Sequence, residues 1–532
     1  MASTPDAPAS SAPPREQWSG QFGFLMAAIG SAIGLGNIWR FPGVAYSNGG
    51  GAFIVPYVIA LLAAGIPILL LDYALGHRFR GSAPAVFRRL SRRFEWLGWF
   101  QVFICFVIMT YYAVVVAWSL RYTLFSISTA WGDDATGFFQ HYIGMDRLGS
   151  GAAYSPEIVM GVAVPLLLVW AFGLVVTALG VSDGVERANK IFLPLLVLMF
   201  IVLVVRALLL PGAGEGLNAL FTPDWSALRD YKVWMAALGQ IFFSLSVGFG
   251  IMLTYASYLQ RKSNLTGTAL VAGFANSSFE ILAGIGVFSA VGFMAHQGGV
   301  SVSEVEGLTG PILSFVTFPK IISMMPGGPI FGVLFFSSLV LAGVTSLLSL
   351  LQVVSGGLQD KFGWSPARSA LVLGVPATVI SLALFGTRSG LNNLDIVDNF
   401  INSVGVVSSA IMFAVLCAVT GPRLGVLRAH LNSVSSVKVP KLWEPLVGIV
   451  IPIVLFVMMA MSIVDLLTNG YGKYPTSYVL IFGWGSVAIA VVAALILTFI
   501  PWKHRPVDAQ ATVAQILADD TDETASTEGG AQ

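Results

Sequence analysis

The sequence predicts an all-α polytopic membrane protein with twelve transmembrane helices. Of its 532 residues, 56% are hydrophobic and only 10% are charged, and the mean hydropathy is +0.81. This composition excludes an ordinary soluble protein. Apolar stretches long enough to cross a bilayer, about 20 residues each, recur along the whole chain. They lie at residues 20–47, 51–79, 97–128, 157–179, 188–211, 233–257, 265–296, 330–358, 366–386, 393–420, 443–468 and 476–501.

The loops between these stretches predict the orientation. We expect no cleavable leader before the first stretch, and we expect the Pro- and Ala-rich residues 1–14 to form a disordered tail. When loops are assigned alternately to the two sides, most of the 28 Lys and Arg residues fall on one side. Positive charge is retained in the cytoplasm during insertion, so we expect cytoplasmic termini and residence in the plasma membrane. The net charge of +1 argues against a nucleic-acid partner, and the placement of Cys105 and Cys417 within spans argues against a disulfide framework.

Two of the predicted helices are interrupted. The first contains GSAIGLGNIWRFP at residues 30–42, and the sixth contains SLSVGFG at residues 244–250. Backbone amides without partners cost several kcal/mol each in hydrocarbon, so irregular chain at membrane depth persists only where it lines a cavity. The two interruptions therefore predict one shared binding site.

The spacing of five helices between the interruptions predicts two repeats. Broken helices in corresponding positions of two inverted repeats are typical of secondary transporters. The predicted organisation is a first repeat at residues 15–211, a second at 212–420, helices eleven and twelve at 421–502 and a cytoplasmic tail at 503–532. Helices eleven and twelve are expected to serve as scaffold or as the contact of a homodimer.

Broken helices offer ligands for both signs of charge. Amino ends of half-helices present free N–H groups to an anion, and carboxyl ends present free carbonyls to a cation. Asn37, Ser244 and Ser246 beside the breaks supply neutral oxygen atoms, which suit a hard monovalent cation, and no thiolate or imidazole lies there. The five histidines are scattered, and no paired nucleophile and base indicates an enzyme.

Several long motifs resemble the neurotransmitter:sodium symporter family, in particular its prokaryotic amino-acid transporters of the leucine-transporter type. They are REQW at 15–18, GSAIGLGNIWRFP at 30–42, NGGGAF at 48–53, GQIFFSLSVGFG at 239–250 and AGVTS at 342–346. The resemblance covers nearly the whole chain and implies the LeuT fold, a 5+5 inverted repeat in which helices one and six are broken. It also implies a sodium-coupled symporter that works by alternating access, with a non-transporting amino-acid sensor of the same fold as the alternative.

The resemblance implies two sodium sites. The first would comprise Ala32, Asn37, Ser244, Asn276 and the carboxylate of the substrate. The second would comprise Gly30, Ile33, Ala342, Thr345 and Ser346. A substrate that is itself an ion ligand couples the two binding events, because each binds better when the other is present. Interhelical hydrogen bonding is the alternative explanation for each polar side chain taken alone.

The resemblance also implies a pocket for a neutral, apolar or aromatic L-α-amino acid. Its residues would be Ala32, Gly34, Leu35, Gly36, Ile108, Tyr112, Phe243, Ser246, Phe249, Ser346 and Leu350. Tyr112 would donate its hydroxyl to the substrate carboxylate. Relatives that carry monoamines have an aspartate where this chain has Gly34, so a substrate with its own carboxylate is expected. The large apolar residues of the set bring no charge to the side-chain compartment, although core packing would explain each of them alone.

Charged residues inside predicted spans are expected to be functional. The residues implied by the resemblance are Arg40 and Asp398 for an extracellular gate, and Arg15, Trp18, Tyr258 and Asp360 for a cytoplasmic latch. Static ion pairs that fix helix positions are the alternative explanation.

Glu280 lies four residues after Asn276 and therefore on the same face of its helix. By resemblance, chloride-dependent relatives carry a small neutral residue there and bind an anion, whereas a fixed carboxylate implies independence from chloride. A buried carboxylate can also take up a proton when its surroundings change, so proton counter-transport is a further hypothesis. Asp72, on the second helix, occupies another acidic position of the family.

Overall fold

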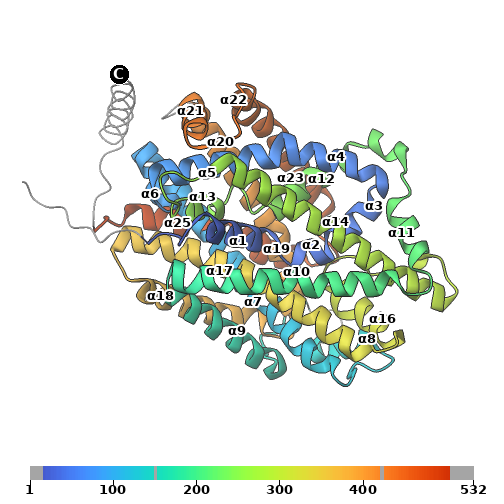
Figure 1. Cartoon of the computed structure of the whole chain (residues 1–532). Coiled ribbons are helices and arrows are strands. Elements are labelled where there is room, and N and C mark those ends of the chain that lie inside the picture. Colours follow the sequence, from blue (N-terminus) through green and yellow to red (C-terminus); the bar gives the residue numbers. More distant parts are fainter. Residues whose placement is uncertain (1–15, 149–152, 420–423, 504–532) are drawn as a thin grey trace, which may run out of the picture.

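The computed structural model describes residues 16–148, 153–419 and 424–503, which form a bundle of helices (Figure 1). The membrane-spanning elements are, in order, α1 (Gln21–Ala32) with α2 (Leu35–Trp39) and α3 (Phe41–Ser47); α4 (Ile54–Ala60) with α5 (Ile66–Phe79); α7 (Glu95–Ser126); α9 (Met160–Ala178); α10 (Arg187–Leu208); α12 (Tyr231–Ser244) with α13 (Ile251–Ala256); α14 (Leu265–Gly298); α17 (Gly328–Phe362); α18 (Pro366–Phe385); α19 (Gly390–Phe400) with α20 (Val407–Val419); α23 (Ile451–Asn469); and α25 (Gly485–Phe499).

Shorter elements join or extend these spans. The short α-helices are α6 (Ala83–Leu90), α8 (Ala135–Ile143), α11 (Ala213–Phe221), α15 (Gly310–Ile312), α16 (Phe318–Met324), α21 (Leu424–Val434), α22 (Trp443–Pro445) and α24 (Thr476–Val479). The π-helical segments are η2 (Leu61–Gly65), η5 (Val181–Glu186), η8 (Leu313–Thr317), η9 (Ile401–Val406), η10 (Leu446–Val450) and η11 (Leu480–Trp484). The 3₁₀ turns are η1 (Gly51–Phe53), η3 (Arg92–Phe94), η4 (Met145–Arg147), η6 (Trp225–Arg229) and η7 (Val302–Glu304).

The number of spans agrees with the prediction as far as helix length can test it. Within the described residues, ten helices are long and apolar enough to cross a bilayer, or up to eleven when the bent pair made of α1 and α2–α3 counts as one span. The sixth predicted span is divided between α12 and α13, which are short because the chain breaks between them. Twelve spans are therefore consistent with the structure, and the repeat boundaries at residues 211 and 420 stay predictions.

The backbone breaks where the sequence predicts. In the first span, Ile33 and Gly34 are extended between α1 and α2, and the two halves are bent by 48°. In the sixth span, residues 245–250 separate α12 from α13, and Ser246 has a φ of 53°. A left-handed conformation costs a residue with a side chain about 1–2 kcal/mol. Contacts around Ser246 must therefore offset this strain.

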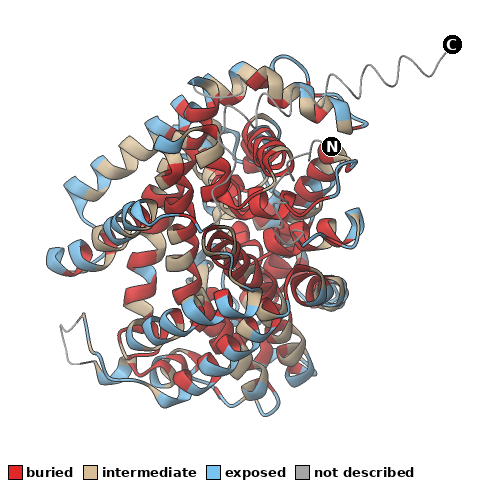
Figure 2. Ribbon diagram, turned by 90° about the vertical axis from the view of Figure 1, so that its left-hand side faces the viewer, coloured by how far each residue is buried: buried red, intermediate tan, exposed pale blue. Residues whose placement is uncertain are grey.

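The interrupted spans lie in the middle of the bundle. α1 packs against α10, α14 and α17, and α13 packs against α5 and α17. Figure 2 shows the buried residues concentrated around the centre and the exposed ones on the outer elements. In the most apolar stretch of the Trp443–Asn469 span, only 22% of the residues are buried. The corresponding share in the Thr476–Phe499 span is 17%. The last two spans therefore lie at the perimeter.

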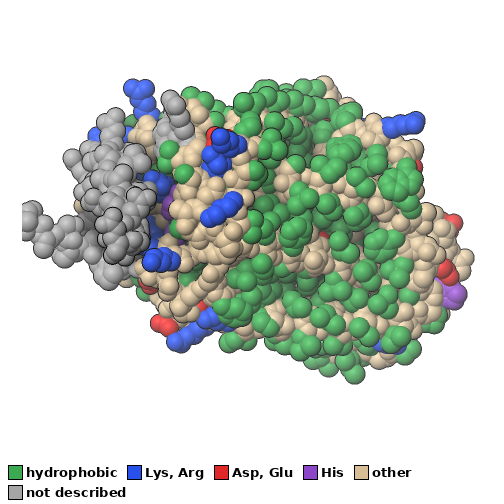
Figure 3. All heavy atoms as spheres, turned by 45° about the horizontal axis from the view of Figure 1, so that its top comes forward, with side chains coloured by type: hydrophobic (Ala, Val, Ile, Leu, Met, Phe, Trp, Pro, Cys, Tyr) green, Lys and Arg blue, Asp and Glu red, His purple; other side chains and the backbone are tan. Residues whose placement is uncertain are grey.

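The outer wall of the bundle is apolar. In the view of Figure 3, hydrophobic side chains cover the middle of the molecule, and Lys and Arg side chains gather toward one end. Exposed residues on this wall include Leu198, Val379 and Val457, which are 60%, 59% and 49% exposed. In water such a surface would be unfavourable, but in a bilayer it contacts acyl chains.

Candidate functional site

Side chains from three neighbouring helices bind the backbone that the sixth span leaves free. The Gly248 amide donates to Asp72 Oδ2 of α5 (3.1 Å). The Gly248 carbonyl accepts from Gln101 Nε2 of α7 (3.1 Å) and from Ser409 Oγ of α20 (2.8 Å). All three side chains are fully buried. Asp72, whose function the sequence leaves open, thus holds the interrupted segment in place.

The break in the first span is bound in the same way. The Gly34 amide donates to Asn37 Oδ1 (3.1 Å), which lies one turn further along the chain. The Leu35 amide donates to the hydroxyl oxygen of Tyr112 on α7 (3.3 Å). Both amides lie at the amino end of a half-helix, where an anionic group is favoured. Tyr112 therefore already touches the backbone that the sequence assigns to the substrate.

One carbonyl joins the two interrupted spans. The Ser31 carbonyl accepts hydrogen bonds from Ser246 Oγ in the sixth span (3.3 Å) and from Ser346 Oγ on α17 (3.4 Å). The predicted convergence of both breaks on one place is therefore present in the fold.

Three side chains of the predicted first sodium site form a hydrogen-bonded chain. Asn37 Nδ2 donates to Asn276 Oδ1 (2.8 Å), and Asn276 Nδ2 donates to Ser244 Oγ (3.0 Å). The three residues come from α2, α14 and α12, and each is at most 2% exposed. Ala32, the fourth predicted residue, ends α1. Neutral oxygen ligands of this kind suit Na⁺ better than a transition metal.

The predicted second sodium site lies between α1 and α17. A Cβ atom on Gly30 would stand 3.5 Å from Thr345 Cβ, so the backbone of α1 passes close to α17. Thr345 Oγ1 and Ser346 Oγ both donate to the Ala342 carbonyl, at 3.0 and 3.2 Å. Ile33, the remaining residue of the set, is the extended residue that follows α1. Hydroxyl and carbonyl oxygens are thus the available ligands here as well.

Two glycines of the first break pack closely against side chains of the predicted pocket. A Cβ atom on Gly34 would stand 2.9 Å from Ser346 Oγ and 3.1 Å from the Tyr112 hydroxyl oxygen. A Cβ atom on Gly36 would stand 2.2 Å from Phe243 Cε1, closer than such contacts allow. Because glycine has no Cβ atom, the backbone can pass directly against Phe243, Ser346 and Tyr112 at these two positions.

The remaining apolar residues of the predicted pocket are buried on three elements. Ile108 and Phe249 are each 7% exposed and Leu350 is 4% exposed. Cys105 Sγ, one turn before Ile108 on α7, donates to the Phe249 carbonyl (3.3 Å), so α7 touches the sixth break at this level. Leu350 follows Ser346 by one turn of α17. None of these side chains is charged, in agreement with the predicted apolar compartment.

Glu280 is fully buried on α14 and binds neutral partners. Gln240 Nε2 of α12 donates to its Oε1 (2.6 Å), and the Tyr57 hydroxyl of α4 donates to its Oε2. Asn276 lies one turn earlier on the same helix. The carboxylate therefore stands beside the first cation set, where a fixed negative charge favours a cation.

The residues of the predicted extracellular gate bind separate neighbours. Arg40 Cζ lies 4.6 Å from the centroid of the Phe243 ring, a cation–π contact. Asp398 Oδ1 accepts from the Tyr111 hydroxyl (2.7 Å) and from Asn402 Nδ2 (2.9 Å). Both gate residues lie in the described part of the chain and form no ion pair of 4.0 Å or less there. Their function as a gate stays a prediction.

Trp18, which precedes α1, is buried against α13 and the residues that follow it. Its indole is 1% exposed, Nε1 donates to the Tyr255 carbonyl (2.8 Å), and its amide donates to the Tyr258 carbonyl (3.1 Å). The Tyr258 hydroxyl accepts from Gln352 Nε2 of α17 (2.9 Å). These contacts seal the ends of α1, α13 and α17 together.

Only part of the predicted latch can be placed. Asp360 Oδ2 accepts a hydrogen bond from the Ser82 amide (2.6 Å) at the start of α6. Arg15, its predicted partner, lies outside the described residues. The Arg15–Asp360 contact therefore stays a prediction.

Beside Asp360 lies an ion pair that sequence reasoning does not identify. Lys361 Nζ stands 2.7 Å from Glu95 Oε1, and both side chains are fully buried. Trp502 Nε1 donates to the same oxygen (2.8 Å), which ties the end of the last span to α7 and α17. Both charges fall just outside the predicted apolar stretches, so hydropathy places them in solvated loops. The one feature of the sequence that could have indicated this pair is the position of Lys361 directly after Asp360.

Two polar residues near the start of α10 were also not identified from the sequence. Glu186 accepts the Ser19 amide (2.9 Å) and thereby joins the segment before α1 to α10. Asn189 is fully buried, its Oδ1 has no hydrogen-bond partner among the described residues, and a Cβ atom on Gly30 would stand 2.3 Å from it. Its position inside the apolar stretch 188–211 is a signal in the sequence. Asn189 Oδ1 is a further candidate ligand for the second cation set.

Comparisons with known proteins relate the chain to one family of transporters. The model of the sodium:neurotransmitter symporter family matches residues 15–142 and 152–505. An uncharacterized sodium-dependent transporter of Methanocaldococcus jannaschii is 40% identical over 486 residues, which cover 91% of this chain and 97% of that protein. The human sodium- and chloride-dependent creatine transporter 1 is 35% identical over 388 residues, 65% of this chain and 60% of that protein.

A solved structure is similar over most of the chain. The crystal structure of MhsT in complex with L-phenylalanine matches with a TM-score of 0.72 and 34% sequence identity, covering 84% of this chain and 99% of that chain. The match confirms the predicted LeuT fold.

Trp18→Ala is expected to open the sealed end of the site. Replacing a buried tryptophan by alanine removes packing that contributes about 3–5 kcal/mol. We expect a cysteine introduced at Ser349, a buried residue that accepts a hydrogen bond from the Tyr255 hydroxyl (2.8 Å), to react about tenfold faster or more with an impermeant maleimide. The measurement is the labelling rate in inside-out vesicles, with the parent chain as background because Cys105 and Cys417 are buried.

The matched control is Trp364→Ala, which removes an indole that stacks on Phe362 outside the seal. It should leave the labelling rate at position 349 unchanged. Equal rates in the Trp18→Ala variant and its parent would show that Trp18 does not close this path.

Proposed function

The chain belongs to the sodium:neurotransmitter symporter family, and we propose that it imports a neutral, apolar or aromatic L-α-amino acid together with Na⁺ by alternating access. Membership makes it a multi-pass membrane transporter and not an enzyme. The observation that carries the proposal is the backbone at Gly34 and Leu35, whose amides are bound by the side chains of Asn37 and Tyr112 and lie beside a set of neutral oxygen ligands.

The carboxylate of the substrate is assigned to the first break. The amides of Gly34 and Leu35 and the hydroxyl of Tyr112 supply donors there. A carboxylate in this position would also complete the first cation set around Asn37 and Asn276. Na⁺ and substrate would then each strengthen the binding of the other.

Two Na⁺ ions are proposed, one in each cation set. The first would bind among Ala32, Asn37, Ser244 and Asn276, and the second among Gly30, Ile33, Ala342, Thr345 and Ser346. The hydrogen bonds now made by these groups contribute only about 0.5–1.5 kcal/mol each, so an ion can displace them. All are neutral ligands, which permit release after transport.

The residues that line the compartment favour a substrate with an apolar side chain. Ile108, Phe243, Phe249 and Leu350 carry no charge, and Gly34 leaves no carboxylate for an amine that lacks its own acid group. MhsT, a protein of similar structure, is in complex with L-phenylalanine. A hydrophobic amino acid fits the uncharged lining and also brings its own carboxylate.

Glu280 is proposed to replace chloride and to exchange a proton during the cycle. Its carboxylate is buried next to the first cation set and is held by the neutral groups of Gln240 and Tyr57. Its negative charge while Na⁺ is bound makes a bound anion unnecessary. Once Na⁺ leaves, the buried carboxylate loses its nearest cation, and protonation would relieve the unpaired charge.

The proposed cycle places both termini in the cytoplasm of the cell and the protein in the plasma membrane. The sealed end at Trp18 and Tyr258 would then face the cytoplasm, and Arg40 and Asp398 would face outward. α23 and α25 expose apolar side chains that would contact lipid or, in a homodimer, a second copy of the chain. A sensor of the same fold would bind the amino acid without moving it.

Uptake by purified protein in proteoliposomes tests the proposal. An inward Na⁺ gradient should drive accumulation of radiolabelled L-phenylalanine, and unlabelled leucine, tryptophan and tyrosine should compete while glutamate and lysine should not. Binding without accumulation would favour the sensor. Competition by charged amino acids would contradict the apolar compartment.

A variant of the pocket sharpens this test. Leu350→Phe should weaken competition by aromatic amino acids relative to alanine by about tenfold, since added volume in an apolar pocket discriminates by about 1–3 kcal/mol. Leu371→Phe makes the same change on the exposed wall of α18, where Leu371 is 55% exposed, and should change nothing.

Asn276→Ala is expected to abolish the effect of Na⁺ on substrate binding. The amide joins Asn37 to Ser244, so its loss removes a proposed ion ligand and the link that positions two others. We expect the Na⁺ concentration for half-maximal binding to rise at least about tenfold, measured by scintillation proximity. Ser277→Ala is the control, because the Ser277 hydroxyl is buried without a hydrogen-bond partner in the described structure. Full Na⁺ stimulation of the Asn276 variant would overturn the first site.

Glu280→Ser is expected to make uptake depend on chloride. Without the fixed carboxylate, an anion must supply the negative charge near the first cation set. Uptake by this variant should fall about tenfold or more when gluconate replaces chloride, while the parent and the exposed-site control Glu215→Ser should be unaffected. A pH-sensitive dye inside the vesicles should report proton movement with the parent only. Chloride-independent uptake by the variant would refute this function of Glu280.

A further inference from the structure

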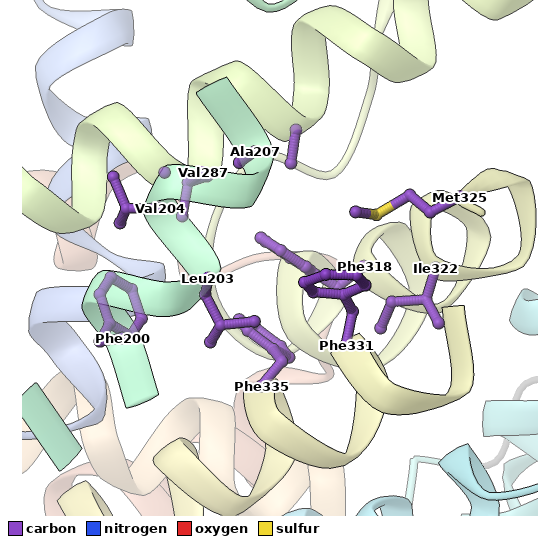
Figure 4. A pocket seen from close by; sticks show the side chains of 12 residues that line it. Phe200, Leu203, Val204, Ala207, Val287, Phe318, Ile322, Met325, Phe331 and Phe335 are labelled. Carbon is purple, nitrogen blue, oxygen red and sulfur yellow. The ribbon is translucent and has the colours of Figure 1, made fainter. Parts of the chain in front are cut away.

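An apolar pocket lies on the outer wall of the bundle, apart from the broken helices. Figure 4 shows side chains of α10 on one side and those of α16 and the first turns of α17 on the other. Its walls include Phe200, Val204, Val287, Phe318, Met325 and Phe335. The free space between them, including the part open to the surroundings, is about 430 Å³. The lining is almost entirely apolar.

The back of the pocket is firmly packed. A Cβ atom on Gly286 of α14 would stand 2.8 Å from Val204 Cγ2, so α10 and α14 are in close contact there. The rings of Phe318 and Phe335 are stacked with centroids 4.0 Å apart and planes inclined by 9°. These contacts fix the walls, so the space is part of the folded structure.

The open side of the pocket continues into the wall that faces lipid. Ile201, Val202 and Val205 on α10 are 43%, 46% and 52% exposed, and Ile330 at the start of α17 is 67% exposed. In a bilayer the neighbours of these residues are acyl chains. Water has no polar partner inside such an apolar recess, so an acyl chain is the occupant that its surface favours.

Arg206 stands beside the pocket. Arg206 is the only charged residue between Ile191 and Gly214, and it lies in the last turn of α10. Its Cζ is 5.4 Å from the centroid of Phe331, which lines the pocket, and Nη2 donates to the Pro326 carbonyl (3.4 Å). Neither contact carries negative charge.

The chemistry of Arg206 selects the head group. A guanidinium has five N–H donors in a planar fork that fits the oxygens of a phosphate. At the end of a membrane-spanning helix the long side chain reaches the level of the phosphates while its stem stays in apolar surroundings. An anion next to the pocket mouth would bind the donors that the protein leaves free.

We propose that this pocket binds an anionic phospholipid, with one acyl chain inserted between α10 and α16 and the phosphate held by Arg206. The lipid belongs to the leaflet on the side of α16. Because α10 and α14 also carry groups of the cation sets at their other turns, the bound chain fixes the outer ends of two helices that contribute to transport. The proposal does not depend on the identity of the transported molecule.

Photocrosslinking tests the site directly on the full chain. The protein is reconstituted in phosphatidylcholine vesicles that contain a small fraction of phosphatidylglycerol with a diazirine on its acyl chain, and crosslinked peptides are identified by mass spectrometry. Label should concentrate in residues 200–207 and 318–335. The same diazirine on phosphatidylcholine should label these peptides about tenfold less, because a zwitterionic head group pairs less well with the arginine.

Two variants of Arg206 distinguish the effect of its charge from that of its guanidinium geometry. Arg206→Gln should reduce labelling by phosphatidylglycerol about tenfold, and Arg206→Lys should restore part of it. Arg229→Gln is the control, because it removes an equal charge from the exposed η6 segment and should leave labelling unchanged.

Filling the pocket gives a second, independent measurement. Ala290→Phe places a ring in the space that the acyl chain would occupy, since Ala290 lines the pocket and is 3% exposed. Labelling of 200–207 and 318–335 should disappear, while labelling of α23 persists. If this variant does not fold, the Arg206 variants still decide. Equal labelling by both lipids, parent-like labelling of Arg206→Gln, or label spread evenly over α10, α23 and α25 would each overturn the proposal.

Discussion

Backbone groups that leave a helix inside a bilayer must find partners within the protein, because hydrocarbon offers none. This requirement organises the centre of the molecule. Gly248 binds side chains from α5, α7 and α20, and the Ser31 carbonyl accepts hydroxyls from the other broken span and from α17. The polar residues scattered through otherwise apolar helices are therefore a consequence of the two breaks.

The same constraint makes the centre suitable for exchange of ligands. Most of its contacts are hydrogen bonds of neutral groups, 2.8–3.4 Å long, and each contributes about 0.5–1.5 kcal/mol. An ion or a zwitterion can replace several of them at little cost. Ion pairs in this position would be much harder to exchange, since separating a buried pair costs about 3–5 kcal/mol.

Buried charges therefore divide into two kinds according to their partners. Glu95 binds Lys361, Arg88 and Trp502, and this cluster joins three spans at one end of the bundle. Glu280 accepts hydrogen bonds from the neutral groups of Gln240 and Tyr57, beside residues that are gathered as cation ligands. A paired charge stabilises the scaffold, whereas a carboxylate without a cation among its hydrogen-bond partners is ready to respond to one.

The sequence by itself determined the class of protein, the positions of the spans and the location of both breaks, because hydropathy and runs of glycine are local properties of the chain. It also identified Asn37, Ser244 and Asn276 as a set through resemblance. The tertiary structure decided which groups bind the broken backbone, that Arg40 lies on Phe243 rather than on Asp398, and that Glu95 and Lys361 meet. Such pairings join residues up to hundreds of positions apart. Only the packing of the helices determines which of many equally polar side chains reaches a given amide or carbonyl.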